Sequence, residues 1–204
     1  MKRLVDRKNI PASLAVMAIL VAVLLYLLPA ESTLGNAIKV VFLHGAVART
    51  GLIVFAVAGL VGIVFLLRKS QVIAEWSLAA QKTAVTVWIM YELTGLASSY
   101  LAWGIAAPFD EPQVVAGIKV LGTCIVFLML TLWINDHRFT AVVNIVMGVM
   151  AWVVMKSAVN VRHPTDPIGS SNSVAFKLIY NLILVMVMVM TIQVGRWLYK
   201  EEQQ

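Results

Sequence analysis

The three histidines of this chain, His44, His137 and His163, are the side chains best suited to chemistry near neutral pH. Imidazole changes its charge between about pH 5 and 8 and is a common metal ligand. The neutral ring is also a frequent axial ligand of haem iron. In the arrangement of helices derived below, His44 and His163 fall at the same membrane face and His137 at the opposite one. This pairing predicts a haem site in which His44 and His163 are the two axial ligands of the iron.

Two charged residues, Arg49 and Glu92, lie inside long apolar segments. Counted inward from the segment ends near Val40 and Leu101, each lies about nine residues deep, which is ~14 Å in a helix. An ionisable residue at that depth marks a functional site unless it has a partner. Two explanations stay open: a buried Arg49–Glu92 ion pair, or an Arg49 that holds a haem propionate or a quinone oxygen.

The composition indicates the kind of protein that positions these residues. Of 204 residues, 61% are hydrophobic and 13% are charged, whereas soluble domains are about half apolar and a quarter charged. The chain is therefore an integral membrane protein. Its single cysteine, Cys124, cannot form a disulfide, a zinc–thiolate cluster or an iron–sulfur site within the chain. The net charge of +6 reflects the usual Lys and Arg beside membrane spans, and no basic stripe with aromatics indicates nucleic-acid binding.

Six apolar segments are long enough, at about 17 residues or more, to cross ~30 Å of hydrocarbon as helices. The predicted fold class is therefore all-α: a polytopic membrane protein whose residues 1–204 form a single transmembrane helical domain. Gly51, Gly59 and Gly62 in the second segment predict close packing against another helix. The spans lie roughly at 11–29, 39–67, 78–102, 113–134, 140–159 and 176–195.

Lys and Arg in the loops and tails predict the orientation, because these residues concentrate on the cytoplasmic side. Two, Lys39 and Arg162, fall on the side opposite the termini. Both termini are thus expected in the cytoplasm, and the chain in the cell's inner (cytoplasmic) membrane as a multi-pass protein. The longest outer loop, residues 160–175, then carries His163. The nine on the side of the termini are Lys2, Arg3, Arg7, Lys8, Arg68, Lys69, Arg138, Arg196 and Lys200.

The sequence lacks the motifs of nucleotide hydrolysis, zinc proteolysis, serine esterase chemistry and thiol redox chemistry. We therefore assign no catalytic residue and expect no independent catalytic activity. The sequence also argues against a small transporter, because the paired interrupted spans that mark a midplane transport site are not found. Alternating Met186, Met188 and Met190 indicate a lipid-facing or core-filling role rather than a copper site.

A series of short motifs runs through residues 40–195. In order they are Phe42-Leu43-His44, Thr94-Gly95, Trp103-Gly104-Ile105-Ala106-Ala107-Pro108-Phe109-Asp110, Asp136-His137-Arg138 and His163-Pro164. With this series the chain resembles the cytochrome c assembly family, the haem-handling membrane proteins of the CcmC/CcsA type. That family has an outer histidine, a Thr-Gly, a W-G-x-W-W-x-W-D segment and a second outer histidine before its last helix. The resemblance implies non-covalent haem b, with His44 and His163 as ligands and Trp103 and Asp110 in the haem-binding surface.

The tryptophan-rich segment of that family is degenerate in this chain. Ala106 and Ala107 stand where the family has paired tryptophans, and Phe109 stands where it has the last one. In the family the segment is an aromatic platform that presents haem to a partner, so its loss favours haem binding over haem transfer.

Two functions therefore stay open. The chain is either a haem-handling factor of cytochrome c-type biogenesis or a haem-bearing electron-transfer or anchor subunit of a respiratory membrane complex. The partners expected are membrane lipid and other membrane or extracytoplasmic redox or haem proteins, and no nucleic acid.

Overall fold

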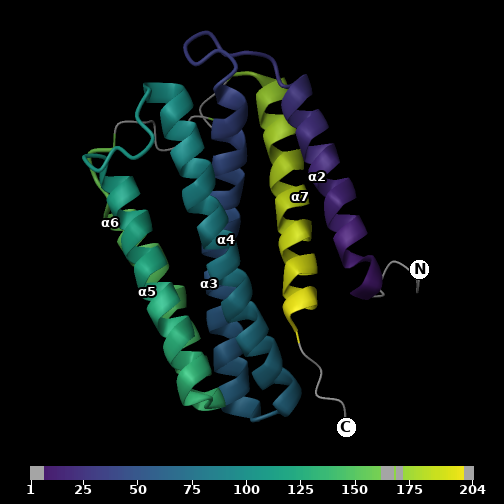
Figure 1. The fold of residues 1–204 in the computed structure, drawn as a ribbon, viewed down its shortest axis with the longest axis vertical. Helices are drawn as coiled ribbons and strands as arrows, with labels where there is room; N and C mark the ends of the chain where they lie inside the picture. Colours follow the sequence, from purple (N-terminus) through teal and green to yellow (C-terminus); the bar gives the residue numbers. More distant parts are fainter. Residues whose placement is uncertain (1–6, 162–167, 169–171, 200–204) are drawn as a thin grey trace.

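The computed structural model is a bundle of six long helices (Figure 1) and describes residues 7–161, 168 and 172–199. A short 3-10 turn, η1 (Arg7–Asn9), precedes the first helix. Within the described residues no strand occurs beyond one isolated bridge between Glu31 and Gly35. The predicted all-α class is confirmed. The helices are α2 (Ile10–Leu27), α3 (Ile38–Arg68), α4 (Gln71–Trp103), α5 (Pro112–Ile134), α6 (His137–Ser157) and α7 (Val174–Leu198).

Local residue chemistry sets several helix ends. Pro112 begins α5, where a missing N–H costs nothing because the first-turn donors have no partner within the helix. The Asp136 carboxylate accepts a hydrogen bond from the Phe139 backbone N–H at 2.7 Å and so caps the start of α6. Gly104 ends α4 and Asn135 ends α5 in the left-handed conformation, with φ of 75° and 51°. Consecutive helices therefore reverse direction at the predicted places.

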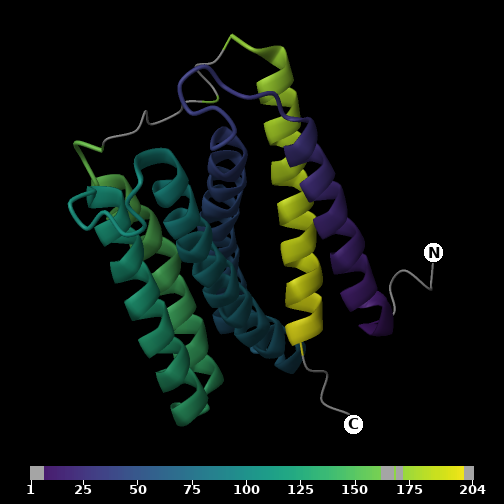
Figure 2. The same cartoon turned by 45° about the horizontal axis from the view of Figure 1, so that its top comes forward.

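The two central helices, α3 and α4, separate the others into two pairs. Figure 2 shows α2 and α7 on one side of α3 and α4, with α5 and α6 on the other. Glycines on α3 allow the closest contacts: a Cβ added to Gly62 would lie 2.6 Å from the Ala141 carbonyl oxygen of α6. A Cβ on Gly51 would lie 2.9 Å from the Trp88 ring of α4. The predicted packing role of these glycines is confirmed.

Among the described residues, five helical segments are long and apolar enough to cross a membrane, as predicted for these spans. They are Arg7–Leu27, Ile38–Arg68, Pro112–Ile134, His137–Ser157 and Val174–Leu198. The 33-residue α4 is not among them. It buries polar side chains inside the bundle instead: Gln81 donates to Thr131 Oγ1 at 3.1 Å, and Asn144 of α6 donates to the Ser77 carbonyl at 2.9 Å. A multi-pass membrane protein follows, and α4 as a sixth span stays a prediction.

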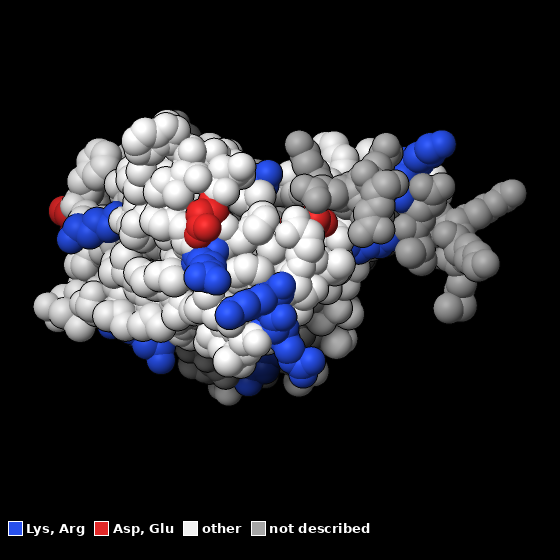
Figure 3. Space-filling model, turned by 90° about the horizontal axis from the view of Figure 1, so that it is seen from below, with Lys and Arg blue, Asp and Glu red and all other residues white. Residues whose placement is uncertain are grey.

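The helices run alternately up and down, so the bundle has two distinct ends (Figure 1). The end that carries η1, residues 69–70 and residues 135–136 is called the terminal end below, because the described chain starts and finishes there. The opposite loop end carries residues 28–37 and 104–111. Lys and Arg gather at the terminal end (Figure 3), among them the exposed Arg7, Lys8, Arg68, Lys69 and Arg138. That distribution agrees with the expected cytoplasmic termini, which remain a prediction.

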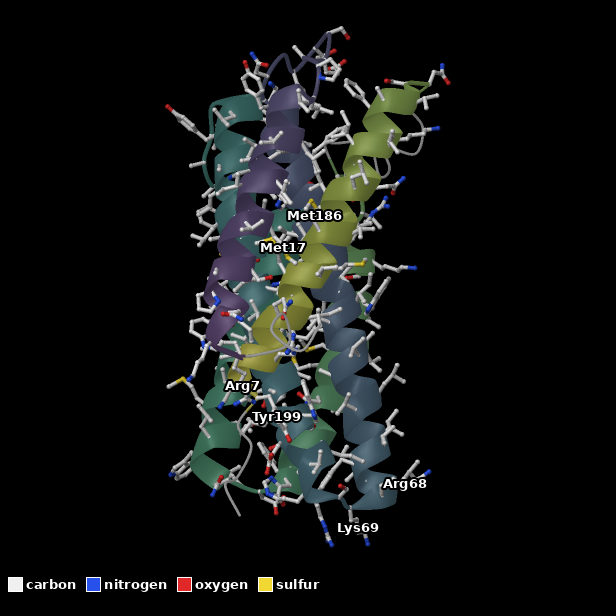
Figure 4. The ribbon with its side chains drawn as sticks, turned by 90° about the vertical axis from the view of Figure 1, so that its right-hand side faces the viewer. Arg7, Met17, Arg68, Lys69, Met186 and Tyr199 are labelled. Atoms are coloured by element: carbon white, nitrogen blue, oxygen red, sulfur yellow. The ribbon has the colours of Figure 1, made fainter. Side chains whose placement is uncertain are left out.

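The peripheral helix α2 runs along α7 (Figure 4), where Met17 and Met186 lie between the two helices. At the terminal end the Arg7 guanidinium donates to the Tyr199 carbonyl and lies 5.3 Å from the centre of the Tyr199 ring. Tyr199 in turn stacks on Trp76 of α4, with ring centres 4.3 Å apart. One cation and two aromatic rings thus join α2, α4 and α7. Met186 packs against the core, in line with a filling role.

The connection between α2 and α3 forms a tight turn at the loop end. The Glu31 carboxylate accepts hydrogen bonds from the Leu34 N–H at 2.7 Å, the Thr33 N–H at 2.8 Å and the Ser32 hydroxyl at 2.7 Å. These bonds favour the charged form and hold the pKa of Glu31 below its ordinary value, the Leu34 N–H having the largest effect. The turn therefore presents a negative charge at the loop end.

Candidate functional site

His44 lies on α3 six residues beyond Ile38, about 9 Å from the loop end of that helix. Its Nδ1 is 3.3 Å from the Thr94 hydroxyl oxygen on α4. The Thr94 hydroxyl already donates to the backbone carbonyls of Met90 at 2.8 Å and Tyr91 at 3.0 Å. With its one hydrogen directed to these carbonyls, the Thr94 oxygen can accept from an Nδ1–H of His44. We therefore infer the neutral tautomer with its proton on Nδ1 and its lone pair on Nε2.

Two neighbours of Thr94 fix the plane of the His44 ring. A Cβ added to Gly95 would lie 3.1 Å from His44 Cε1, so the absence of a side chain at Gly95 lets the imidazole approach α4. Tyr91 stacks on the other side, with ring centres 4.9 Å apart and an interplanar angle of 25°. The Thr94-Gly95 pair picked out in the sequence is thus part of the surroundings of His44.

A row of aromatic rings continues from His44 towards the middle of the bundle. The Tyr91 and Trp88 ring centres are 4.5 Å apart, and those of Trp88 and Phe55 are 5.4 Å apart. Trp88 is fully buried and donates through Nε1 to the Gly117 carbonyl at 3.0 Å. The sequence analysis did not single out Trp88. The signal was available, because residues three apart on one helix lie on the same face.

Glu92 points towards α5 and not towards Arg49. A Cβ added to Gly117 would lie only 2.6 Å from Glu92 Oε1 and 2.8 Å from Tyr91 Cε1. Glu92 Oε1 is buried and accepts no hydrogen bond from any described residue. Glu111, the residue before α5, is 1% exposed and interacts electrostatically with Tyr91. Two acidic groups therefore lie close to the tyrosine that stacks on His44.

Arg49 lies on another face of α3. Its guanidinium carbon is 5.3 Å from the ring centre of Tyr180, a buried residue of α7. Five residues separate Arg49 from His44, which is about 140° around a helix and explains why the two face different neighbours. The structure does not bring Arg49 together with Glu92 or with the His44 ring, although the depth count from the sequence put all three in the same half of the bundle.

The remaining predicted site residues lie closer to the loop end or outside the described part. Trp103 ends α4 and is 38% exposed, nine residues or about 14 Å beyond Thr94 along the helix. Asp110 is exposed in the 104–111 connection. His163 falls outside the described residues. His137 begins α6 at the terminal end, where its ring meets Phe65 edge-on at 6.2 Å.

The described side chains around His44 fit axial ligation of haem iron. In the part of the chain that the structure describes, no three His, Cys, Asp or Glu side chains come together as a metal-binding group. Haem needs no such group, since the porphyrin supplies the equatorial ligands and the protein the axial ones. A histidine whose Nδ1–H is held by a second group and whose Nε2 carries the lone pair is the usual form of a metal-bound imidazole. His44 fits that requirement.

Fold and site together define a polytopic helical membrane protein with an oriented histidine near its loop end. No protein-family description, curated protein or solved structure matches the chain. The cytochrome c assembly resemblance therefore stands on the motifs quoted above.

Proposed function

We propose that this chain is a haem b-binding integral membrane protein in which His44 and His163 are the axial ligands, near the loop end. The contact between His44 Nδ1 and Thr94 Oγ1 at 3.3 Å carries the proposal. A hydrogen bond at Nδ1 orients the ring, fixes the tautomer and increases the basicity of Nε2 towards a metal. The haem is non-covalent, because the sequence has no Cys-x-x-Cys-His for thioether attachment.

The surroundings of His44 support a low-spin haem held at the edge of the bundle. Haem would supply reversible one-electron chemistry, and the chain would hold and shield it. Tyr91 covers one side of the imidazole and Gly95 allows its approach to α4. His44 itself is half-buried, which suits a ligand near a membrane surface.

Within this function, haem handling in cytochrome c-type biogenesis is the first candidate. It follows from the motif series and uses the exposed Trp103 and Asp110 at the loop end as contacts for a haem-accepting protein. The protein would then lie in the inner (cytoplasmic) membrane beside extracytoplasmic haem proteins. It would have no catalytic activity of its own.

Electron relay in a respiratory membrane complex is the second candidate, and a different observation favours it. The row His44–Tyr91–Trp88–Phe55 keeps successive ring centres within 5.4 Å and leads from the proposed ligand into the bundle. Closely spaced rings of this kind suit a protein that retains its haem and passes electrons.

The test is an absorbance spectrum of the protein purified from haem-replete cells, followed by titration of haem-free protein with added haem. We expect a low-spin spectrum with one haem per chain, extractable by acidic solvent. A protein that is colourless and binds no added haem refutes the proposal. Stable retention through redox cycles supports the relay, whereas transfer to an extracytoplasmic acceptor supports haem handling.

A further inference from the structure

Gly117 of α5 marks a point where two ionisable side chains of α4 converge. A Cβ placed there would lie 2.6 Å from Glu92 Oε1 and 3.3 Å from Tyr91 Oη. The carboxyl of Glu92 and the hydroxyl of Tyr91 therefore share the space that a side chain at position 117 would occupy. Gly122, five residues further along α5, has nothing within 4 Å of the same added atom. The close approach is specific to Gly117.

The carboxyl of Glu92 is placed where a permanent charge is costly. Oε1 is buried and accepts no hydrogen bond from the described residues, and the Arg49 guanidinium lies over Tyr180 on the opposite side of α3. A carboxylate that leaves water without a cation beside it is strongly destabilised, whereas a protonated carboxyl is uncharged and can donate a hydrogen bond. Gaining and losing a proton is thus the chemistry open to Glu92.

Two polar neighbours of Glu92 lie in the loop half. Tyr91 Oη is 3.3 Å from the same added atom at Gly117. Glu111 lies at the start of α5, six residues before Gly117 and about 9 Å nearer the loop end.

Three other ionisable groups lie on the helices around Glu92. Cys124 of α5 is buried, and its thiol donates to the Leu121 carbonyl at 3.2 Å. His44 of α3 contacts the face of Tyr91 and not its hydroxyl edge. Lys119 is exposed, two residues or about 200° from Gly117 around α5, and so lies on the far side of that helix.

We propose that Glu92 is a proton-binding site of the bundle. The Glu92 carboxylate takes up one proton from water at the loop end when the pH falls and returns it to water when the pH rises, so protons are conserved and no electron is exchanged.

Infrared difference spectroscopy of the full chain between about pH 4 and pH 10 tests the site directly. The wild type should gain the C=O stretch of one buried carboxylic acid as the pH falls, and Glu92→Gln, which keeps the shape of the side chain, should lose that band. Gly117→Ala should shift the band, and the matched Gly122→Ala should not. Identical spectra for wild type and Glu92→Gln overturn the proposal.

The infrared measurement needs no haem, so its failure is distinct from failure of the haem proposal.

Discussion

The two halves of the bundle use polar residues in opposite ways. In the terminal half the described buried polar groups are uncharged amides and hydroxyls, and two of the amides bond across helices. The Asn144 amide donates to both the Ser77 carbonyl and the Ser77 hydroxyl at 2.9 Å. Gln81 bonds to Thr131 in the same way. Such amide and hydroxyl contacts hold helices together in lipid. They offer no group that changes charge.

In the loop half several of the polar groups are ionisable. His44, Tyr91 and Glu92 cluster there, and glycines at 95 and 117 give them space. The contrast teaches that one half fixes the bundle while the other keeps groups able to bind a metal or a proton. Substitutions in the terminal half should therefore change stability, and substitutions in the loop half should change ligand binding.

Removal of the proposed ligand should have the largest effect and tests the contrast most severely. His44→Ala or His163→Ala should each abolish the low-spin haem spectrum, because one axial imidazole is then missing. His137→Ala at the terminal end is the control and should leave the spectrum intact. Equal losses from all three variants would refute the division into two halves.

Loss of the hydrogen bond that orients His44 should have the next largest effect. Thr94→Val keeps the shape of the side chain but removes the oxygen that accepts from Nδ1–H, and loss of such a partner usually lowers metal affinity by about 10–100-fold. Titration with haem should show that weakening, while thermal unfolding stays within about 1 kcal/mol of wild type. Thr123→Val, which removes an exposed hydroxyl bonded to its own helix, is the control. Equal haem affinities for the two variants would remove Thr94 from the site.

Much of the fold is predictable from local signals. Pro112 and the Asp136 cap place the ends of α5 and α6, and the predicted span 113–134 agrees with Pro112–Ile134. The prediction for the start of α4 is less accurate: the span was expected from residue 78, whereas the helix begins at Gln71. Its first turns carry Glu75 and Ser77, which do not resemble a membrane segment, and Ser77 packs inside the bundle.

The candidate site was predictable only in part, for a geometric reason. The sequence singled out His44, but its hydrogen bond to Thr94 joins residues 50 positions apart and depends on how α3 and α4 pair. Counting residues from helix ends gave similar depths for Arg49 and Glu92. Depth does not define the side of a helix, and the two residues face α7 and α5 respectively.

In the terminal half, a substitution at a close contact between helices should lower the free energy of unfolding by a moderate amount. Gly62→Ala places a methyl group 2.6 Å from the backbone oxygen of Ala141, so α3 and α6 must separate. Overpacking of this kind costs about 1–3 kcal/mol. Gly122→Ala meets no atom within 4 Å and should be neutral or stabilising by up to about 1 kcal/mol. Denaturant unfolding in detergent measures both, and a Gly62→Ala variant as stable as wild type would contradict the close contact.

The smallest effect should come from the two charges that sequence reasoning paired. A double-mutant cycle of Arg49→Gln and Glu92→Gln should give a coupling energy within about 0.5 kcal/mol of zero, the range for residues that share no contact. A cycle of Arg49→Gln with Tyr180→Leu should instead give about 0.5–1 kcal/mol, because the guanidinium lies 5.3 Å from that ring centre. Unfolding free energies of the four proteins in each cycle provide the measurement. A coupling of several kcal/mol between Arg49 and Glu92 would restore the buried ion pair. It would also place a cation beside the Glu92 carboxylate. The proton-binding proposal depends on the absence of such a cation.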